Sequence, residues 1–478
     1  MKQPEKRNWK ILYTDFTGPV KRAVELVAKE MGGYILRDAG VYCVNVLAVE
    51  KLSDSIDKNA VIIGTFDSHP LFGKLIQREE VPQNGFAVKV LDSPFKEGTQ
   101  LVLLCGDTPS AAFYAACHFV DDYLSEFALL RNGLRFPWET FLHPLPAYTF
   151  STAPKAKTRS LFTWGHPINN YRKTIETLAR LKFNQIIVWN DHLPVNAEEF
   201  TEYAHSFGLS VIWGFAWGWF PDCKKADLSK LGALKEAVLR TYETVYKGKG
   251  DGIYFQSFTE LSQATLQGRL IADVVTEFVN DTAGELLKRE PNLLIQFGLH
   301  ANSVKNHTEY LAKIDPRVQI IWENCGVFPY SHEFTDDEAE RRETEDFTRL
   351  VISQRPGTDV GMVFKGMLKQ DWPHFEHQAG PFIMGDSSRA VIHHDMDIFT
   401  PIWRFLQSEW LTKGDFAHRL AGIVLEEATA DINFCVAAHI ADEPWYPLAL
   451  CGEIFWDPAV SYKEIVDKVS KRRWVKFA

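Results

Sequence analysis

Three carboxylic acids follow predicted strands in the second half of the chain: Glu260, Glu323 and Asp371. Cleavage of a glycosidic bond needs two carboxyl groups, one to protonate the leaving oxygen and one to act as nucleophile or as base for water. We assign Glu260 as the general acid and Glu323 as its partner or base. Asp371 could replace Glu323 as the base. Each acid alone could equally cap the next helix or pair with a lysine.

Aromatic and polar side chains follow the same predicted strands and suit the apolar faces and hydroxyl groups of a sugar. The predicted substrate-binding residues are Trp164, Asn190, Asp191, Trp217, His300, Asn302, Trp322, Lys365 and Trp372. Lys365 and Arg159 could also bind an anionic substituent such as a uronate carboxylate. Any single tryptophan carries little weight, because tryptophans also fill cores, and a strand-end Asn or Asp also serves as a helix cap.

Other chemistries lack their sequence signatures. The chain has no GxSxG elbow for a serine hydrolase, and neither a GxGxxG nor a Walker A sequence for a nucleotide. The run His393–Asp397 (HHDMD) would suit a metal-dependent isomerase or hydrolase, which is an alternative reading of the chain. Adjacent loop residues rarely converge on one ion, however, so we expect no metal and no cofactor.

Eight strand-then-helix units are predicted to position these side chains. The predicted strands are Ser160–Trp164, Gln185–Trp189, Ser210–Phe215, Gly252–Phe258, Leu293–Leu299, Gln319–Trp322, Val360–Phe364 and Phe382–Met384. Strands that alternate with helices pair in parallel, and eight such units fit a closed (β/α)8 TIM-type barrel better than an open sheet. Because active-site groups of such barrels lie at the C-terminal strand ends, the three acids should share one bowl.

The rest of the chain is organised around this α/β barrel. Residues 1–145 alternate short apolar strands with helical patterns, which predicts an accessory α/β sandwich domain. The proline-rich residues 136–157 predict a linker. Residues 155–400 form the predicted catalytic barrel, and residues 401–478 a C-terminal helical part packed on it. The basic tip at 471–476 (KRRWVK) is expected to be a solvated helix end.

Composition narrows the classes of partner. The formal net charge of -10 argues against a nucleic acid, whose phosphates need a basic face. No apolar stretch is long enough to span a membrane, and no secretory signal opens the sequence, so we expect a cytoplasmic protein. Seven scattered cysteines without zinc spacing fit reduced thiols. An oligosaccharide is the expected ligand, and exposed apolar residues in the C-terminal helices could hold a homodimer.

Several segments resemble those of known glycoside hydrolases. Ala60–Pro70 (AVIIGTFDSHP) and Leu101–Phe119 are similar to the accessory domain that precedes the barrel in α-glucuronidases and β-hexosaminidases. Arg159–Asp191 resembles the first barrel strand and helix of these enzymes, and Gly452–Val460 (GEIFWDPAV) their closing W-[DN]-P segment. The similar pieces imply the architecture more firmly than the substrate.

The α-glucuronidase family is the better match at the acids. That family uses a glutamic acid and separate Asp and Glu bases on later strands, so the resemblance implies these places for Glu260, Asp371 and Glu323, with Lys365 near the uronate. A β-hexosaminidase would have an Asp before its acid, where this chain has Thr259. We therefore expect a glycosidase acting on short oligosaccharides, some of them bearing uronic acids. A β-hexosaminidase-like glycosidase and a catalytically silent carbohydrate-binding barrel are the alternatives.

Overall fold

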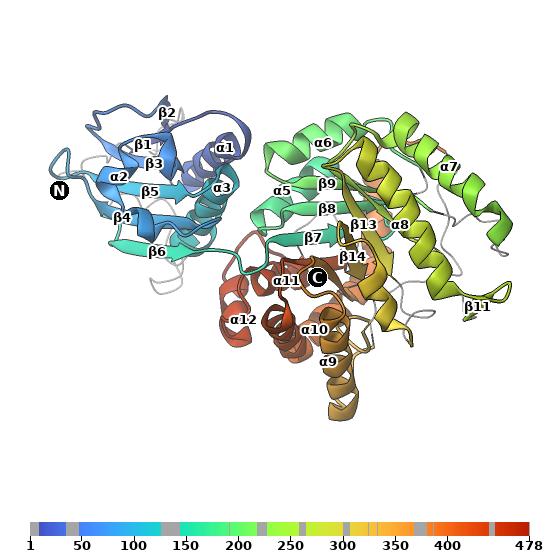
Figure 1. The fold of residues 1–478 in the computed structure, drawn as a ribbon. Coiled ribbons are helices and arrows are strands. Elements are labelled where there is room, and N and C mark those ends of the chain that lie inside the picture. The colour runs from blue at the N-terminus through green and yellow to red at the C-terminus, as the bar shows by residue number, and fades with distance from the viewer. Residues whose placement is uncertain are drawn as a thin grey trace. The chain divides into compact units, whose positions relative to one another are not determined.

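The chain folds into two compact units (Figure 1). The structure is a computed structural model that describes residues 9–34, 47–125, 144–190, 192–217, 227–257, 264–299, 306–323, 325–331, 333–367, 380–385, 387–438 and 445–477. The first unit comprises Met1–Pro154, His205–Gly208 and Asp467–Trp474. The second comprises Lys155–Ala204, Leu209–Val466 and Val475–Ala478.

The first unit is built on a six-stranded mixed sheet with the strand order β2-β1-β3-β5-β4-β6. Its strands are β1 (Trp9–Tyr13), β2 (Ala48–Lys51), β3 (Asn59–Thr65), β4 (Phe86–Asp92), β5 (Gln100–Gly106) and β6 (Tyr148–Thr152). The central strands β3 and β5 are almost continuous apolar runs, as expected for parallel strands that are covered on both faces. Strand β4 runs antiparallel to β5 and β6.

The helices of the first unit are α1 (Gly18–Tyr34), the short α2 (Phe72–Leu75) and α3 (Pro109–His118). Helix α3 begins after Thr108, whose hydroxyl accepts the Ala111 N–H at 3.2 Å, and Pro109 suits the first helical position. It packs against α1 and continues in a π-helical turn, Phe119–Tyr123. Strand β6 corrects the prediction of a linker over 136–157, because residues 148–152 complete the sheet along β4.

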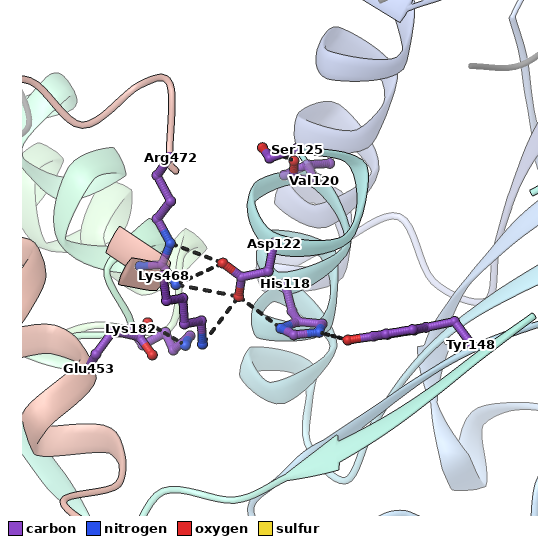
Figure 2. Close-up of polar contacts among 9 residues, drawn as sticks. All are labelled: His118, Val120, Asp122, Ser125, Tyr148, Lys182, Glu453, Lys468 and Arg472. Atoms are coloured by element: carbon purple, nitrogen blue, oxygen red, sulfur yellow. Dashed lines mark hydrogen bonds and ion pairs between the residues drawn. The ribbon is translucent and has the colours of Figure 1, made fainter. Parts of the chain in front are cut away.

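Residues 467–474 join the first unit through a cluster of charges around Asp122 (Figure 2). One carboxylate oxygen of Asp122 accepts from Arg472 Nε at 3.1 Å, and the other lies 3.2 Å from Lys468 Nζ and 2.9 Å from His118 Nδ1. Burial alone would raise the pKa of Asp122, but the charges of Arg472 and Lys468 outweigh it and hold the pKa well below its usual range. The prediction that 471–476 is solvated is wrong for Arg472, which is 4% exposed.

The second unit is a closed barrel of eight parallel strands, which confirms the predicted fold class. The strands are β7 (Thr158–Phe162), β8 (Gln185–Trp189), β9 (Ser210–Gly214), β10 (Gly252–Phe255), β13 (Leu294–Leu299), β14 (Val318–Trp322), β15 (Val360–Met367) and β16 (Ile432–Ala438). The eighth strand is β16, which pairs with β15 and β7. The prediction of a strand at Phe382–Met384 is therefore wrong, and the segment beyond residue 400 contributes a barrel strand as well as helices.

Helices and short turns connect the barrel strands or follow the last of them. They are α5 (Tyr171–Arg180), α6 (Ala197–Ser206), α7 (Leu231–Thr241) with a π-helical turn (Tyr242–Tyr246), the hairpin β11 (Thr265–Leu266) and β12 (Arg269–Leu270), α8 (Ile271–Arg289), a 3-10 segment (Thr308–Lys313), α9 (Glu338–Ser353), α10 (Arg389–Glu427), α11 (Tyr446–Trp456) and α12 (Tyr462–Ser470). None of the helices within the described ranges combines the length and apolar character needed to cross a membrane.

The barrel interior is layered along its axis. Near the N-terminal strand ends the layer is polar: Gln185 Oε1 accepts from Ser160 Oγ at 2.9 Å, Gln296 Nε2 at 2.8 Å and Asn433 Nδ2 at 3.0 Å. These mutual hydrogen bonds offset the cost of burying amides. The next layer is apolar and includes Phe162, Ile187, Ile212, Ile321, Val363 and Cys435. Polar groups return at the C-terminal strand ends.

Candidate active site

Glu323 lies inside the barrel at the C-terminal end of β14 and is fully buried. Its N–H donates to the Leu299 carbonyl oxygen at 3.1 Å, which continues the β13–β14 ladder and fixes the backbone there. Because side chains alternate along a strand, Glu323 shares the inward face with Gln319 and Ile321. The predicted strand-end position of Glu323 is therefore the one observed.

Lys365 approaches Glu323 from the next strand, β15. Its Nζ lies 3.1 Å from Glu323 Oε2, and the two side chains are 8% and 0% exposed. The Lys365 N–H donates to the Pro329 carbonyl oxygen at 2.6 Å, and the register of β15 with β16 shifts between Phe364 and Met367. Such a bulge re-aims side chains at a strand end. The site therefore contains a buried, oriented ion pair.

Two neutral donors hold the other oxygen of Glu323. Gln256 Nε2 donates to Oε1 at 2.7 Å, and the Tyr254 hydroxyl also donates to it. Burial raises the pKa of Tyr254 well above its usual range, and the charge of Glu323 raises it further, so the hydroxyl keeps its proton. Gly298 makes this possible, because a Cβ there would stand 1.8 Å from the Tyr254 hydroxyl oxygen.

Two tryptophans lie beside these groups. The Trp164 ring lies under the Lys365 ammonium, with 3.9 Å from Nζ to the ring centroid. Trp164 has a φ of 47°, an unusual backbone conformation for a bulky residue and one that clusters at functional sites. Trp189 is half-buried, meets Tyr254 edge to face at 5.3 Å, and packs over Gly214, where a Cβ would lie 2.7 Å from the ring.

The structure corrects two predicted substrate-binding residues. Trp217 is fully buried and stacks on Phe255 at 3.7 Å between ring centroids, on the outer surface of the barrel. Trp322 is also fully buried, and its ring lies 5.8 Å from Phe347 of α9. Rings packed between the barrel and its helices have no free face for a sugar. Asn190 directly follows β8 and is partly buried, in keeping with a place at the barrel mouth.

The other predicted site residues lie outside the described residues: Glu260, Asp371, Asp191, His300, Asn302 and Trp372. Arg159, predicted as an anion-binding candidate, lies at the opposite end of β7. Its guanidinium donates to the carbonyl oxygens of Lys182 and Ala156, both at 2.7 Å. It therefore braces the backbone at the N-terminal end of the barrel.

Sequence reasoning missed Tyr254, Gln256 and Trp189 as members of the site. The missed signal is the alternation of side chains along each strand. In β10, residues 252, 254 and 256 share one face, and in β14 Glu323 and Trp322 must point to opposite faces. Counting from a strand-end carboxylate would have selected the inward residues and removed Trp322.

Within the part of the chain that the structure describes, no group of three or more His, Cys, Asp or Glu side chains could hold a metal ion. The His393–Asp397 run lies in the first turns of α10 and not in a loop, and His393, His394 and Asp397 are exposed there.

Comparison with known proteins identifies the fold. No protein-family model matches the chain, and no curated protein matches it. The solved structure CpGH84B is similar with a TM-score of 0.50 and 11% identity, over 96% of this chain and 70% of that chain. CpGH84D gives a TM-score of 0.45 and 11% identity, over 74% of this chain and 57% of that chain. The chain thus spans little more than half the length of CpGH84D, and the likeness to CpGH84B supports the barrel with its N-terminal unit.

Proposed function

We propose that this chain is a glycoside hydrolase that acts on short oligosaccharides. The observation that carries the proposal is Glu323, a buried carboxylate at the C-terminal end of a closed barrel, held by Tyr254, Gln256 and Lys365. That end is where TIM-type barrels do their chemistry. CpGH84B, whose name denotes glycoside hydrolase family 84, adds support through its fold.

The surroundings of Glu323 suit a carboxylate that works in its ionised form. Gln256 donates to one carboxylate oxygen of Glu323, and the ammonium cation of Lys365 lies beside the other. An ionised carboxylate can act as nucleophile or as base for water, and it stabilises the positive charge that develops on the sugar. A second, protonated carboxyl must then act on the leaving oxygen, and Glu260 is our candidate for that role.

Trp189 is our candidate for the sugar platform in place of Trp217 and Trp322. It is the half-buried tryptophan at the end of β8, whereas Trp217 and Trp322 are fully buried outside the barrel. An aromatic ring with one free face can stack on the apolar face of a sugar. Its edge-to-face contact with Tyr254 would place that sugar next to the Glu323 cluster.

The substrate within this class stays a prediction. An α-glucuronidase-like enzyme would need a cation for the uronate, and Lys365 is already paired with Glu323 at 3.1 Å. Uronate binding by Lys365 would therefore require an exchange of partners. A hexosaminidase-like specificity is the alternative, with Thr259 in place of the expected Asp speaking against it.

The test is a substrate panel with matched variants. Aryl glycosides of neutral hexoses, N-acetylhexosamines and glucuronic acid, together with aldouronic oligosaccharides, are offered to wild type, Glu260→Gln, Glu323→Gln and the control Glu426→Gln, an exposed acid of α10. We expect one class to be cleaved, with a loss of about 10²-fold or more in the first two variants and none in the control. Undiminished cleavage by Glu260→Gln would remove that residue from the mechanism.

A catalytically silent carbohydrate-binding barrel is the second candidate, and one observation favours it. Glu323 is 0% exposed and fully engaged by its neighbours, as a purely structural carboxylate would be. This candidate predicts calorimetric binding of a sugar in the panel without turnover. A separation of more than about 10 Å between the Glu260 and Glu323 carboxyl groups, beyond the range for either hydrolytic mechanism, would also favour it.

A further inference from the structure

The two oxygens of Glu323 have chemically different partners. Oε1 accepts from the neutral donors Gln256 and Tyr254, whereas Oε2 lies 3.1 Å from the Lys365 ammonium. Neutral donors orient a carboxylate, and a cation additionally stabilises its charge. Orientation and charge are thus supplied by different residues on different strands.

Lys365 is itself held in place from two directions. The N–H groups of Lys365 and Gly366 both donate to the Pro329 carbonyl oxygen, at 2.6 and 3.1 Å. At the far end of the side chain, the Trp164 ring covers the ammonium at 3.9 Å. Since Lys365 is 6% exposed as a residue, little water screens its charge from Glu323.

The geometry points to Lys365 as the positioning residue that keeps Glu323 ionised for the proposed glycosidase reaction, with Trp164 as the wall that seals the pair from water. Lys365 therefore sets the protonation state of Glu323 and does not bind a uronate. This inference rests on the proposed function, but its core, the charge state of Glu323, can be measured without a substrate.

The barrel offers a matched control pair. Lys182 and Glu453 lie 2.7 Å apart, are 3% and 6% exposed, and Lys182 lies 5.0 Å from the centroid of the Trp456 ring. Lys182 lies shortly before β8, which begins at Gln185, so this pair lies at the N-terminal end of the barrel. Lys182→Gln should therefore perturb folding as Lys365→Gln does, without reaching the proposed chemistry.

The first experiment measures kcat/KM against pH on a glycoside that wild type cleaves, for Lys365→Gln, Lys365→Arg and Lys182→Gln. Without the cation the carboxylate is harder to ionise, so the acidic limb should move to higher pH by about one unit or more in Lys365→Gln. Lys365→Arg and Lys182→Gln should keep the limb of wild type. An unmoved limb in folded Lys365→Gln would overturn the inference.

The second experiment needs no activity. Infrared difference spectra recorded during acidification contain a carboxylic acid band of Glu323, identified by its absence in Glu323→Gln. This band should appear at higher pH in Lys365→Gln than in wild type and Lys182→Gln, and the same pH in all three would overturn the inference. A shifted band in a protein that cleaves none of the glycosides would support the role of Lys365 and reject the proposed function. If Lys365→Gln does not fold, Lys365→Met, which also removes the cation, gives the same comparison with wild type and Lys182→Gln.

Discussion

Among the residues that the structure describes, the barrel holds two buried Lys–Glu pairs of almost the same construction, one at each end of its strands. Lys365 and Glu323 lie 3.1 Å apart at the C-terminal ends, and Lys182 and Glu453 lie 2.7 Å apart at the N-terminal end. Each lysine also lies over a tryptophan ring. Burial and pairing are therefore the same, and neither can identify a functional site by itself.

The pairs differ in what surrounds the carboxylate. Glu323 faces the barrel interior, where Tyr254 and Gln256 donate to the oxygen that does not face Lys365. Glu453 lies on α11, which approaches the end of α5 so closely that a Cβ on Gly452 would stand 2.4 Å from the Leu181 carbonyl oxygen. One carboxylate lies inside the barrel at its C-terminal strand ends, and the other lies on a helix that follows the barrel strands. Position in the fold, not the ion pair, separates chemistry from stability.

The largest expected effect separates the two glutamates by activity. Glu323→Gln should lower kcat/KM by about 10³-fold, because the neutral amide cannot act as nucleophile or base. Glu453→Gln should leave kcat/KM within about twofold of wild type. Steady-state assays below the melting temperature of each variant check this. Equal losses of kcat/KM in both variants would contradict the assignment of the chemistry to the C-terminal end of the barrel.

Glu323→Gln and Glu453→Gln should lower the free energy of unfolding by similar amounts. Each leaves a buried lysine unpaired and should cost about 3–5 kcal/mol in the free energy of unfolding. Urea titrations measure this cost. The double variants Glu323→Gln with Lys365→Met, and Glu453→Gln with Lys182→Met, remove the unpaired charge and should recover much of it. Recovered stability without recovered activity at the C-terminal end would show that Glu323 serves the reaction in addition to stability.

Asp122 in the first unit is a structural carboxylate whose contribution to stability should depend on pH. Its pKa is held well below the usual range, so its contribution to stability is complete above about pH 4, the unfolded value, and is lost as the pH falls toward the folded value. Asp122→Asn should therefore be less stable than wild type at pH 7, and the gap should narrow below about pH 4. Thermal unfolding at both pH values tests this, and a gap that widens on acidification would contradict the assigned sign.

Trp189 should give the smallest effect. Trp189→Ala removes the half-buried ring at the barrel mouth and should raise KM by about tenfold, since an aromatic contact is worth about 0.5–1.5 kcal/mol. Trp217 is buried between the barrel and its helices, so Trp217→Phe should lower the melting temperature and leave KM unchanged. Michaelis–Menten analysis of both variants checks the assignment, and a KM effect in Trp217→Phe alone would reverse it.

Much of the fold could be predicted from the sequence, because buried parallel strands are recognisable as short apolar runs. Apolar runs such as Gln185–Trp189 and Val360–Phe364 were placed within a few residues of the observed strands. The eighth strand was misplaced because α10, 39 residues long, separates β15 from β16 and breaks the regular strand-to-helix spacing. A short apolar segment before that helix, Phe382–Met384, was taken for the strand instead.

The site was less predictable, because the sequence of one strand does not show how that strand pairs with its neighbours. Glu323 could be placed at a strand end from its neighbours in sequence. Its contact with Lys365 depends on the register of β14 with β15 and on the shift near Phe364, neither of which can be read from one strand. The same holds for Asp122 and Arg472, which are 350 residues apart in the chain.

The most direct test of the account is chemical rescue at Glu323. Glu323→Ala is assayed with an activated aryl glycoside of the class that wild type cleaves, with and without sodium azide, and the product is identified by mass spectrometry. We expect the variant to be inactive alone, azide to restore cleavage, and the product to be a glycosyl azide, because the small anion replaces the missing carboxylate or its water. Cleavage by Glu323→Ala at the rate of wild type without azide would show that Glu323 takes no part in the reaction.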